Sequence, residues 1–205
     1  MPHHPFGEPS RMNEANPRAT LAALWSPLLA VTTRVGDRAN GQIIVAALSG
    51  SILPDAPRVL IELWKSNLTH DMVLASGTFA LHLLDGSPGP ALNASLALIR
   101  ALGMHSGRDS DKLTGIDQRP GANGCPILTN TLSYLEATVS ATFDAEEATI
   151  FLADVTGGAR LREGTPLTLP QFNATLPADW HTEYAASRAR QDAAARQARG
   201  ISPIS

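Results

Sequence analysis

Residues 65–83 read KSNLTHDMVLASGTFALHL, and this stretch sets the arrangement of the middle of the chain. It begins where an apolar run over residues 58–64 stops, so a strand is expected to end there. A polar loop follows, and Thr69 is predicted to be the N-cap of a short helix over residues 70–76. Another strand is predicted over residues 78–84. The sequence therefore predicts a strand, a loop, a helix and a strand in close succession.

The loop before this helix has the composition of an anion-binding site. Free backbone N–H groups at the start of a helix favour negative charge, so a phosphate would be well placed there. The side chains that add charge or hydrogen-bonding groups to the loop are Lys65, Ser66, Asn67 and Thr69. An ordinary capped helix beside a solvated lysine explains the same residues, and the local sequence leaves both interpretations open. His70 is expected to lie on the surface.

A second polar stretch, residues 105–112, reads HSGRDSDK. It combines a predicted turn with cations and carboxylates. The turn residues are Ser106 and Gly107, the cations are Arg108 and Lys112, and the carboxylates are Asp109 and Asp111. The two cations could bind an oxyanion, with the carboxylates balancing or orienting them. A solvated charged loop is the alternative.

A third stretch, residues 46–51, reads AALSGS and consists mostly of small residues. Small side chains let a flat ligand lie close to the backbone, whose N–H and C=O groups can then meet a ring edge. Gly50 would relax the backbone for such an approach. A β-bulge or a tight strand crossing accounts for the same composition.

The hydrophobic pattern predicts a mainly β fold. Strands are expected over residues 27–35, 42–48, 58–64, 78–84, 131–143 and 149–155, with a polar turn over residues 36–41. Helices are expected over residues 90–102 and 178–199. There is too little helix for repeated βαβ units, so a closed antiparallel barrel with short inserted helices fits best. We expect an N-terminal arm over residues 1–20, one domain over residues 21–165, and a C-terminal extension with a helix over residues 166–205.

Composition excludes several classes of function. The net charge of −3 over 205 residues gives no positive field for nucleic acid or anionic lipid. The single Cys125 excludes a disulfide framework or a thiolate zinc site within one chain, and we expect it to be a small buried residue. No run of about 18 apolar residues predicts a membrane span. No histidine pair has metal-ligand spacing, so no metal site is expected. The single cysteine and the lack of a predicted membrane span together favour a cytoplasmic location.

Several motifs, taken in order, resemble the flavin reductase-like family of FMN-binding split barrels. The resemblance covers roughly residues 27–155. Its marks are PLLAVTT at 27–33, LSGSILPDAP at 48–57, KSNLTHDMVLASGTFALHLL at 65–84, SGRDSDKL at 106–113, GCP at 124–126 and TIFLADV at 149–155. Each motif is weak alone, but the ordered set is fairly specific.

The resemblance implies a Greek-key split β-barrel that forms a homodimer and binds FMN, or else FAD, with NAD(P)H as co-substrate. Under this resemblance, the residues that would line the flavin ring are Ala47, Leu48, Ser49 and Gly50. Those that would hold the phosphate are Lys65, Ser66, Asn67 and Thr69. Those that would close the site or contact the flavin are Ser106, Gly107, Arg108, Asp111 and Lys112. No catalytic residue is assigned.

One departure from the family bears on function. Many relatives carry a histidine where Ala148 stands, and the short flavin reductases use it near the nicotinamide. The expected function is an oxidoreductase that transfers a hydride from NAD(P)H to flavin. Because of Ala148, an FMN-binding protein or electron carrier without NAD(P)H turnover stays open. A barrel used only for protein contact, docking through residues 178–199, is a third hypothesis.

Overall fold

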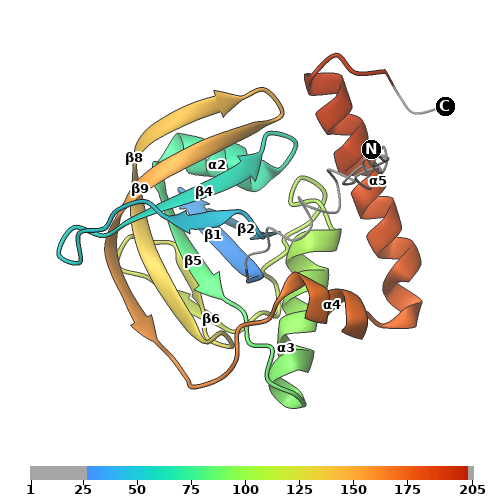
Figure 1. The fold of residues 1–205 in the computed structure, drawn as a ribbon, viewed down its shortest axis with the longest axis horizontal. Coiled ribbons are helices and arrows are strands. Elements are labelled where there is room, and N and C mark those ends of the chain that lie inside the picture. The colour runs from blue at the N-terminus through green and yellow to red at the C-terminus, as the bar shows by residue number, and fades with distance from the viewer. Residues whose placement is uncertain (1–26, 203–205) are drawn as a thin grey trace, which may run out of the picture.

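The computed structural model describes residues 27–202 and shows a curled seven-stranded antiparallel sheet with helices along one side (Figure 1). The hydrogen-bonded order is β2-β1-β5-β8-β9-β4-β3. The strands of this sheet are β1 (Leu29–Val35), β2 (Arg38–Ile44), β3 (Ala47–Ser49), β4 (Arg58–Trp64), β5 (Thr78–Leu83), β8 (Ser133–Ala145) and β9 (Ala148–Arg160). A separate small sheet pairs β6 (Gln118–Pro120) with β7 (Pro126–Leu128). The predicted mainly β split-barrel class is confirmed, whereas the predicted arm lies outside the described residues.

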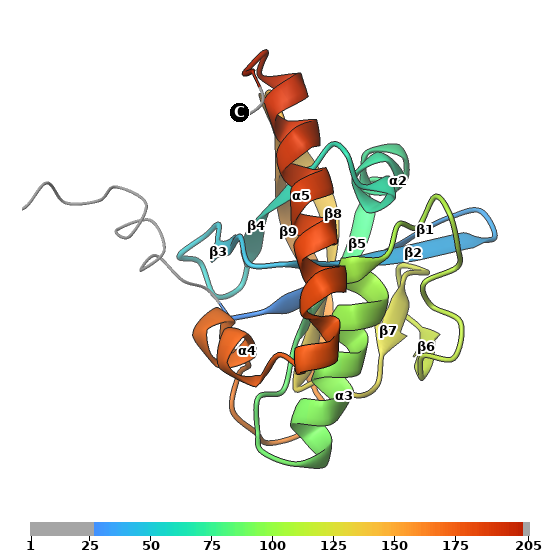
Figure 2. The ribbon, with the colours of Figure 1, turned by 90° about the vertical axis from the view of Figure 1, so that its right-hand side faces the viewer.

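The helices are α2 (Leu68–Ser76), α3 (Pro90–Ile99), the π-helical η1 (Arg100–Met104), α4 (Leu169–Thr175), the short η2 (Ala178–Trp180) and α5 (His181–Ala198). Figure 2 shows α5 running past α3 and across the side of the barrel. The predicted helices over residues 90–102 and 178–199 are present, whereas α4 was not predicted. Among the described residues, none of these helices has the length and apolar character needed to cross a membrane.

The link between β2 and β3 forces the sheet to curl. These strands stand at opposite ends of the hydrogen-bonded order, yet only Val45 and Ala46 separate them in sequence. Three peptide steps span at most about 11 Å, so Ile44 and Ala47 must lie close together. The two ends of the sheet therefore meet, and the barrel is split between β2 and the β3–β4 pair.

The single strand predicted over residues 42–48 is wrong for the same reason. The chain leaves β2 at Ile44 and joins the other end of the sheet at Ala47. The polar turn predicted over residues 36–41 is also too long, because β1 and β2 pair as far as Val35 and Arg38. The polar residues of β2 belong to an end strand, and polarity alone did not distinguish such a strand from a turn.

The two larger of three apolar clusters among the described residues form most of the core. The first fills the barrel interior and contains Ile61, Leu63, Val73, Phe79 and Phe151, all fully buried. The second lies outside the sheet, where α3, η1 and α4 cover it, and includes Leu84, Leu96, Leu102, Leu167 and Phe172. Adjacent residues of β1 serve both clusters, which is why this strand is apolar on both faces.

The start of α2 differs from the prediction. Its N-cap residue is Asn67, which makes no side-chain capping bond, so the assignment of Thr69 as the cap is wrong. Thr69 instead lies in the first turn, where its buried hydroxyl accepts a hydrogen bond of 2.9 Å from Asn40 Nδ2. The expectation that His70 lies on the surface is also wrong, since it is only 5% exposed. Cys125 is buried, as predicted.

His82 is a fully buried histidine that the structure holds neutral. The backbone N–H of Leu128 donates to its Nε2 at 3.1 Å, so the ring proton sits on Nδ1 and bonds the Ala30 carbonyl at 3.2 Å. Burial lowers the pKa of His82 to about 4. Protonation therefore favours the unfolded chain, whose histidine keeps a pKa near 6.5.

We predict that this histidine makes the fold sensitive to acid between pH 6.5 and 4. As pH falls through that window, the histidine of the unfolded chain becomes protonated while His82 of the folded protein stays neutral. The free energy of unfolding therefore decreases by about 3 kcal/mol. Urea unfolding of the wild type and His82→Gln at pH 7, 5.5 and 4 would show that the difference between their free energies of unfolding becomes smaller as pH falls. A difference that stays constant with pH would contradict the assignment, and His181→Gln, at an exposed histidine, is the control.

Candidate functional site

A pocket of about 380 Å³ opens at the split in the barrel, which is a size typical of small-molecule sites. The link and β2 line one side of it, and β4 lines another. Its lining from these elements and the start of α2 includes Gln42, Val45, Ala46, Glu62, Trp64 and Asn67. The pocket therefore exists because the two ends of the sheet approach one another without pairing.

Helix α5 forms the outer wall of this pocket. It contributes Tyr184, Ser187, Arg188 and Gln191 to the lining. The Arg188 guanidinium lies over the ring of Trp64, 5.6 Å from its centroid, in a cation–π contact. This contact joins the C-terminal helix to the end of β4.

Three residues of α5 fasten the helix beside the pocket by bonding η1 and its neighbours. Ser187 Oγ donates to the Gly103 carbonyl at 3.2 Å, and Arg190 Nη2 donates to the Met104 carbonyl at 3.1 Å. The Glu183 carboxylate pairs with Arg100 at 3.0 Å and with His105 at 3.1 Å. The π-helical segment thus presents carbonyl groups to α5, and the wall is held by several independent contacts.

Gln42 is the polar residue of the pocket whose hydrogen bonding is incomplete. It is 5% exposed, and among residues 27–202 its Oε1 atom has no hydrogen-bond partner. A buried acceptor left unpaired costs about 1–3 kcal/mol. Once the amide turns toward the pocket, an N–H group of a ligand would satisfy this acceptor, so the pocket fits a heterocycle with a polar edge.

A second pocket of about 430 Å³ adjoins the first under the C-terminal half of α5. The two pockets share Trp64 and Gln191 in their linings, and the second adds Lys65 and Ser66. Lys65 Nζ donates to Asp144 Oδ1 at 2.7 Å, and this bond lowers the pKa of Asp144. The arrangement is a groove with an apolar compartment next to one that carries an ammonium group, which suits a flat ring with an anionic tail.

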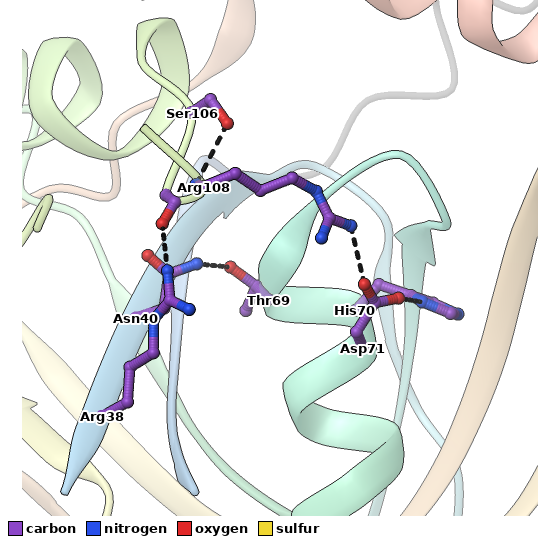
Figure 3. Close-up of polar contacts among 8 residues, drawn as sticks. Arg38, Asn40, Thr69, His70, Asp71, Ser106 and Arg108 are labelled. Atoms are coloured by element: carbon purple, nitrogen blue, oxygen red, sulfur yellow. Dashed lines mark hydrogen bonds and ion pairs between the residues drawn. The ribbon is translucent and has the colours of Figure 1, made fainter. Parts of the chain in front are cut away.

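The stretch over residues 105–112 docks onto the start of α2 through a chain of polar contacts (Figure 3). Arg108 Nη2 pairs with Asp71 Oδ2 at 2.6 Å, and the other oxygen of Asp71 lies 2.9 Å from His70 Nδ1. His70 Nε2 in turn lies 2.9 Å from the hydroxyl of Thr149 on β9. Burial opposes ionisation of Asp71, but its bonds to His70 and Arg108 outweigh burial and lower its pKa.

Gly107 allows this loop to approach β2 closely. A Cβ atom at this position would overlap the side-chain amide of Asn40. The Gly107 carbonyl accepts a hydrogen bond of 2.7 Å from Arg38 Nη2, while Asn40 bonds Thr69 on α2. Figure 3 shows Asn40 of β2 and Thr69 of α2 pointing toward one another. The turn predicted at Ser106 and Gly107 is therefore a contact point between three elements.

Asp111 and Lys112 fasten the same loop from its far end. The Asp111 carboxylate accepts from the Leu113 backbone at 2.9 Å and from the Thr114 hydroxyl at 3.0 Å. The buried Lys112 Nζ donates to the Leu102 carbonyl in η1 at 2.7 Å, and burial lowers its pKa to about 8. Both residues bond the loop itself or η1, and a contact with flavin stays a prediction for them.

The predicted ring-contacting stretch on β3 lies at the end of the sheet and lines neither pocket. Leu48 is 68% exposed, and Ser49 Oγ bonds the Ser51 carbonyl at 3.0 Å. At Gly50 a Cβ atom would lie 2.8 Å from Leu152 Cδ1, so this glycine serves a tight crossing over β9. Contact between residues 47–50 and a flavin also stays a prediction.

The structure thus brings together part of the predicted set and adds residues that the sequence analysis missed. Asn67 lines the first pocket, and Lys65 and Ser66 line the second. The missed residues are Gln42, Trp64 and Arg188. Gln42 stands in a strand that also contains Arg38 and Asn40, so its sequence context did not indicate a buried site residue. Nothing local linked Arg188 to residues more than a hundred positions earlier.

We predict that Gly107→Ala disturbs the docking of this loop. The added methyl group collides with Asn40, so the loop or the amide must shift, and the free energy of unfolding should fall by about 1–3 kcal/mol. Urea unfolding measures the change. Ser110→Ala, at an exposed position of the same loop, is the control and should stay within about 0.5 kcal/mol of the wild type. Equal stability of the two variants would contradict the prediction.

Comparison with known proteins gives a consistent result. The model of the family described as flavin reductase like domain matches residues 21–173. A high molecular weight rubredoxin of Moorella thermoacetica is 37% identical over 154 residues, which are 75% of this chain and 64% of that protein. The chain therefore spans less than two thirds of the length of that relative.

Two further proteins are similar over most of their lengths. The FMN reductase (NADH) SmoA of Agrobacterium fabrum is 28% identical over 167 residues, covering 82% of this chain and 88% of that protein. The structure of an NADH:FAD oxidoreductase of Streptomyces globisporus matches with a TM-score of 0.59 and 23% identity, covering 75% of this chain and 89% of the other. The structural match at this identity concerns the fold.

Proposed function

The chain belongs to the family of flavin reductase like domains, and on this premise we propose that it binds FMN in the groove beneath α5 and oxidises NAD(P)H. The observation that carries the proposal is the buried Gln42 acceptor, which has no partner within residues 27–202, in a mostly apolar pocket that adjoins the Lys65 compartment. A flavin mononucleotide has the matching parts, which are a flat ring with a polar edge and an anionic phosphate.

The residues of the groove divide the binding of such a molecule between them. Trp64 and the aliphatic link residues would cover the ring, while Lys65 and Ser66 would meet the phosphate after Lys65 leaves Asp144. Asn67 and Thr69 lie at the start of α2, where backbone N–H groups favour an anion. The flavin itself supplies the redox chemistry by accepting a hydride, and the protein supplies position and electrostatics.

A nicotinamide co-substrate is proposed because the names of two similar proteins state NADH as theirs. One of these names states FMN and the other FAD, so FMN is the proposed flavin and FAD the alternative. The loop over residues 105–112 would close over the bound nucleotides. Hydride transfer needs no general acid or base, so the pocket requires none.

A second candidate function is an FMN-binding protein or electron carrier without its own NAD(P)H turnover. The observation that favours it is Ala148, which is buried and pairs with Trp64 in the register of β4 and β9. The resemblance to the flavin reductase-like family implies a histidine at this position. A methyl group there offers no hydrogen bond to a nicotinamide, so flavin binding and nicotinamide oxidation need separate tests.

A homodimer and a cytoplasmic location belong to the same proposal. Leu48, Ile52 and Leu53 are 68%, 98% and 55% exposed near the β3–β4 connection, where a second copy would bury them. A single buried cysteine is compatible with a reducing compartment.

We predict that the purified protein oxidises NADH or NADPH when FMN is present, because the flavin must carry the hydride. Absorbance at the nicotinamide band, with and without FMN, measures the reaction, and fluorescence quenching measures flavin binding. Flavin binding without oxidation of either nicotinamide would support the second candidate function. Failure to bind either FMN or FAD would reject both functions and leave a barrel for protein contact.

We further predict that Lys65→Ala separates binding of the phosphate from binding of the ring. Loss of one charged contact should raise the dissociation constant for FMN about tenfold and leave that for riboflavin, which has no phosphate, within about twofold. Arg58→Ala removes an exposed cation at the start of β4, which pairs with Asp154 at 2.7 Å, and should change neither constant. Equal weakening of both flavins in Lys65→Ala would place the phosphate elsewhere.

A further inference from the structure

Helix α5 lies beyond residues 21–173, the segment matched by the family, yet it lines the pocket. Two charged residues line the pocket, and they are Glu62 from β4 and Arg188 from α5. The Glu62 carboxylate already accepts a bond of 3.3 Å from Trp64 Nε1. This part of the chain therefore adds a positive charge that the matched segment does not provide.

The contacts of the Arg188 guanidinium leave its charge without an anionic partner among residues 27–202. It lies over the neutral ring of Trp64, and its Nη1 donates to the amide oxygen of Gln191 at 3.3 Å. Neighbouring residues of α5 bond the carbonyls of Gly103 and Met104, so the backbone of Arg188 is held at the pocket wall. Arg188 is exposed, so water solvates this cation until an anionic ligand fills the pocket beside it.

Gln42 lines the same pocket from β2, and its amide must turn toward the pocket for the enclosed Oε1 atom to meet a ligand. Its Oε1 atom is a buried acceptor without a partner among the described residues, and the same amide carries two N–H donors. The pyrimidine edge of a flavin ring presents one N–H donor between two carbonyl acceptors. This edge also gains negative charge when the flavin is reduced.

We propose that Gln42 and Arg188 together recognise the pyrimidine edge of the flavin ring. Gln42 Oε1 accepts the ring N–H, and the Arg188 guanidinium faces the carbonyl side where charge accumulates on reduction. The inference rests on the proposed function, because it requires a flavin in this pocket. It makes α5 part of the redox site, with Gln42 contributing to affinity and Arg188 favouring the reduced state.

The two roles predict different results for two variants. Gln42→Leu removes the acceptor, so the dissociation constants of both FMN and riboflavin should rise about tenfold. Arg188→Gln removes a charge that matters mainly after reduction, so oxidised FMN should bind within about threefold of the wild type while reduced FMN binds about tenfold more weakly. For a two-electron couple, that tenfold difference lowers the midpoint potential of the bound flavin by about 30 mV.

Flavin binding by fluorescence titration and the midpoint potential by dye equilibration are the two measurements. Arg196→Gln is the control on α5, since Arg196 pairs with Asp192 at 2.7 Å and lines neither pocket. Gln42→Leu should keep the wild-type melting temperature or exceed it, because it replaces an unpaired buried amide by an apolar group. This melting measurement separates loss of binding from loss of folding.

The outcomes distinguish this inference from the function on which it rests. A wild type that binds no flavin overturns both. A wild type that binds flavin, with unchanged riboflavin affinity in Gln42→Leu and unchanged potential in Arg188→Gln, overturns the inference and leaves the proposed function standing. If Gln42→Leu weakens only the interaction with NADH or NADPH, the amide belongs to the nicotinamide and the flavin assignment is wrong.

Discussion

The two-residue link between β2 and β3 is the constraint on which the site depends. Because these neighbours in sequence occupy opposite ends of the sheet, the sheet must curl until its ends meet. The ends do not pair with each other, and the gap between them is the pocket. The residues that line it therefore come from the strands that border the split, together with the helices laid across it. The short link between β2 and β3 therefore accounts for both the curled barrel and the pocket.

The sequence allowed much of the fold to be predicted, since apolar and β-branched runs identified most strands, helical spacing identified α3, and an Ala-, Arg- and Gln-rich composition identified α5. Prediction failed where a local pattern has two solutions. The apolar run of residues 42–48 crosses from one end of the sheet to the other without a change in composition. Short elements such as β6, β7 and α4 contain too few residues for a period to be visible.

The candidate site was predicted only in part, and the reason is again physical. Lys65, Ser66 and Asn67 belong to one loop, so their proximity follows from sequence. Lys112 and Asp111 have the chemistry of ligands, but in the structure Lys112 bonds the Leu102 carbonyl of η1 and Asp111 bonds the residues that directly follow the loop. His70 appeared to be a surface residue because nothing local indicated the Thr149 hydroxyl and the Phe151 ring that enclose it. Whether such a residue is buried or exposed depends on partners from strands that are distant in sequence.

The π-helical segment η1 has a consequence for how this protein can vary. Its carbonyls at Gly103 and Met104 hold α5, and those bonds leave the barrel core untouched. Substitutions along the outer helix can therefore alter the charge and shape presented to a ligand while the strands keep their packing. In this architecture, ligand preference and folding stability depend on separate stretches of the chain. Substitutions can therefore change the first while the second stays nearly constant.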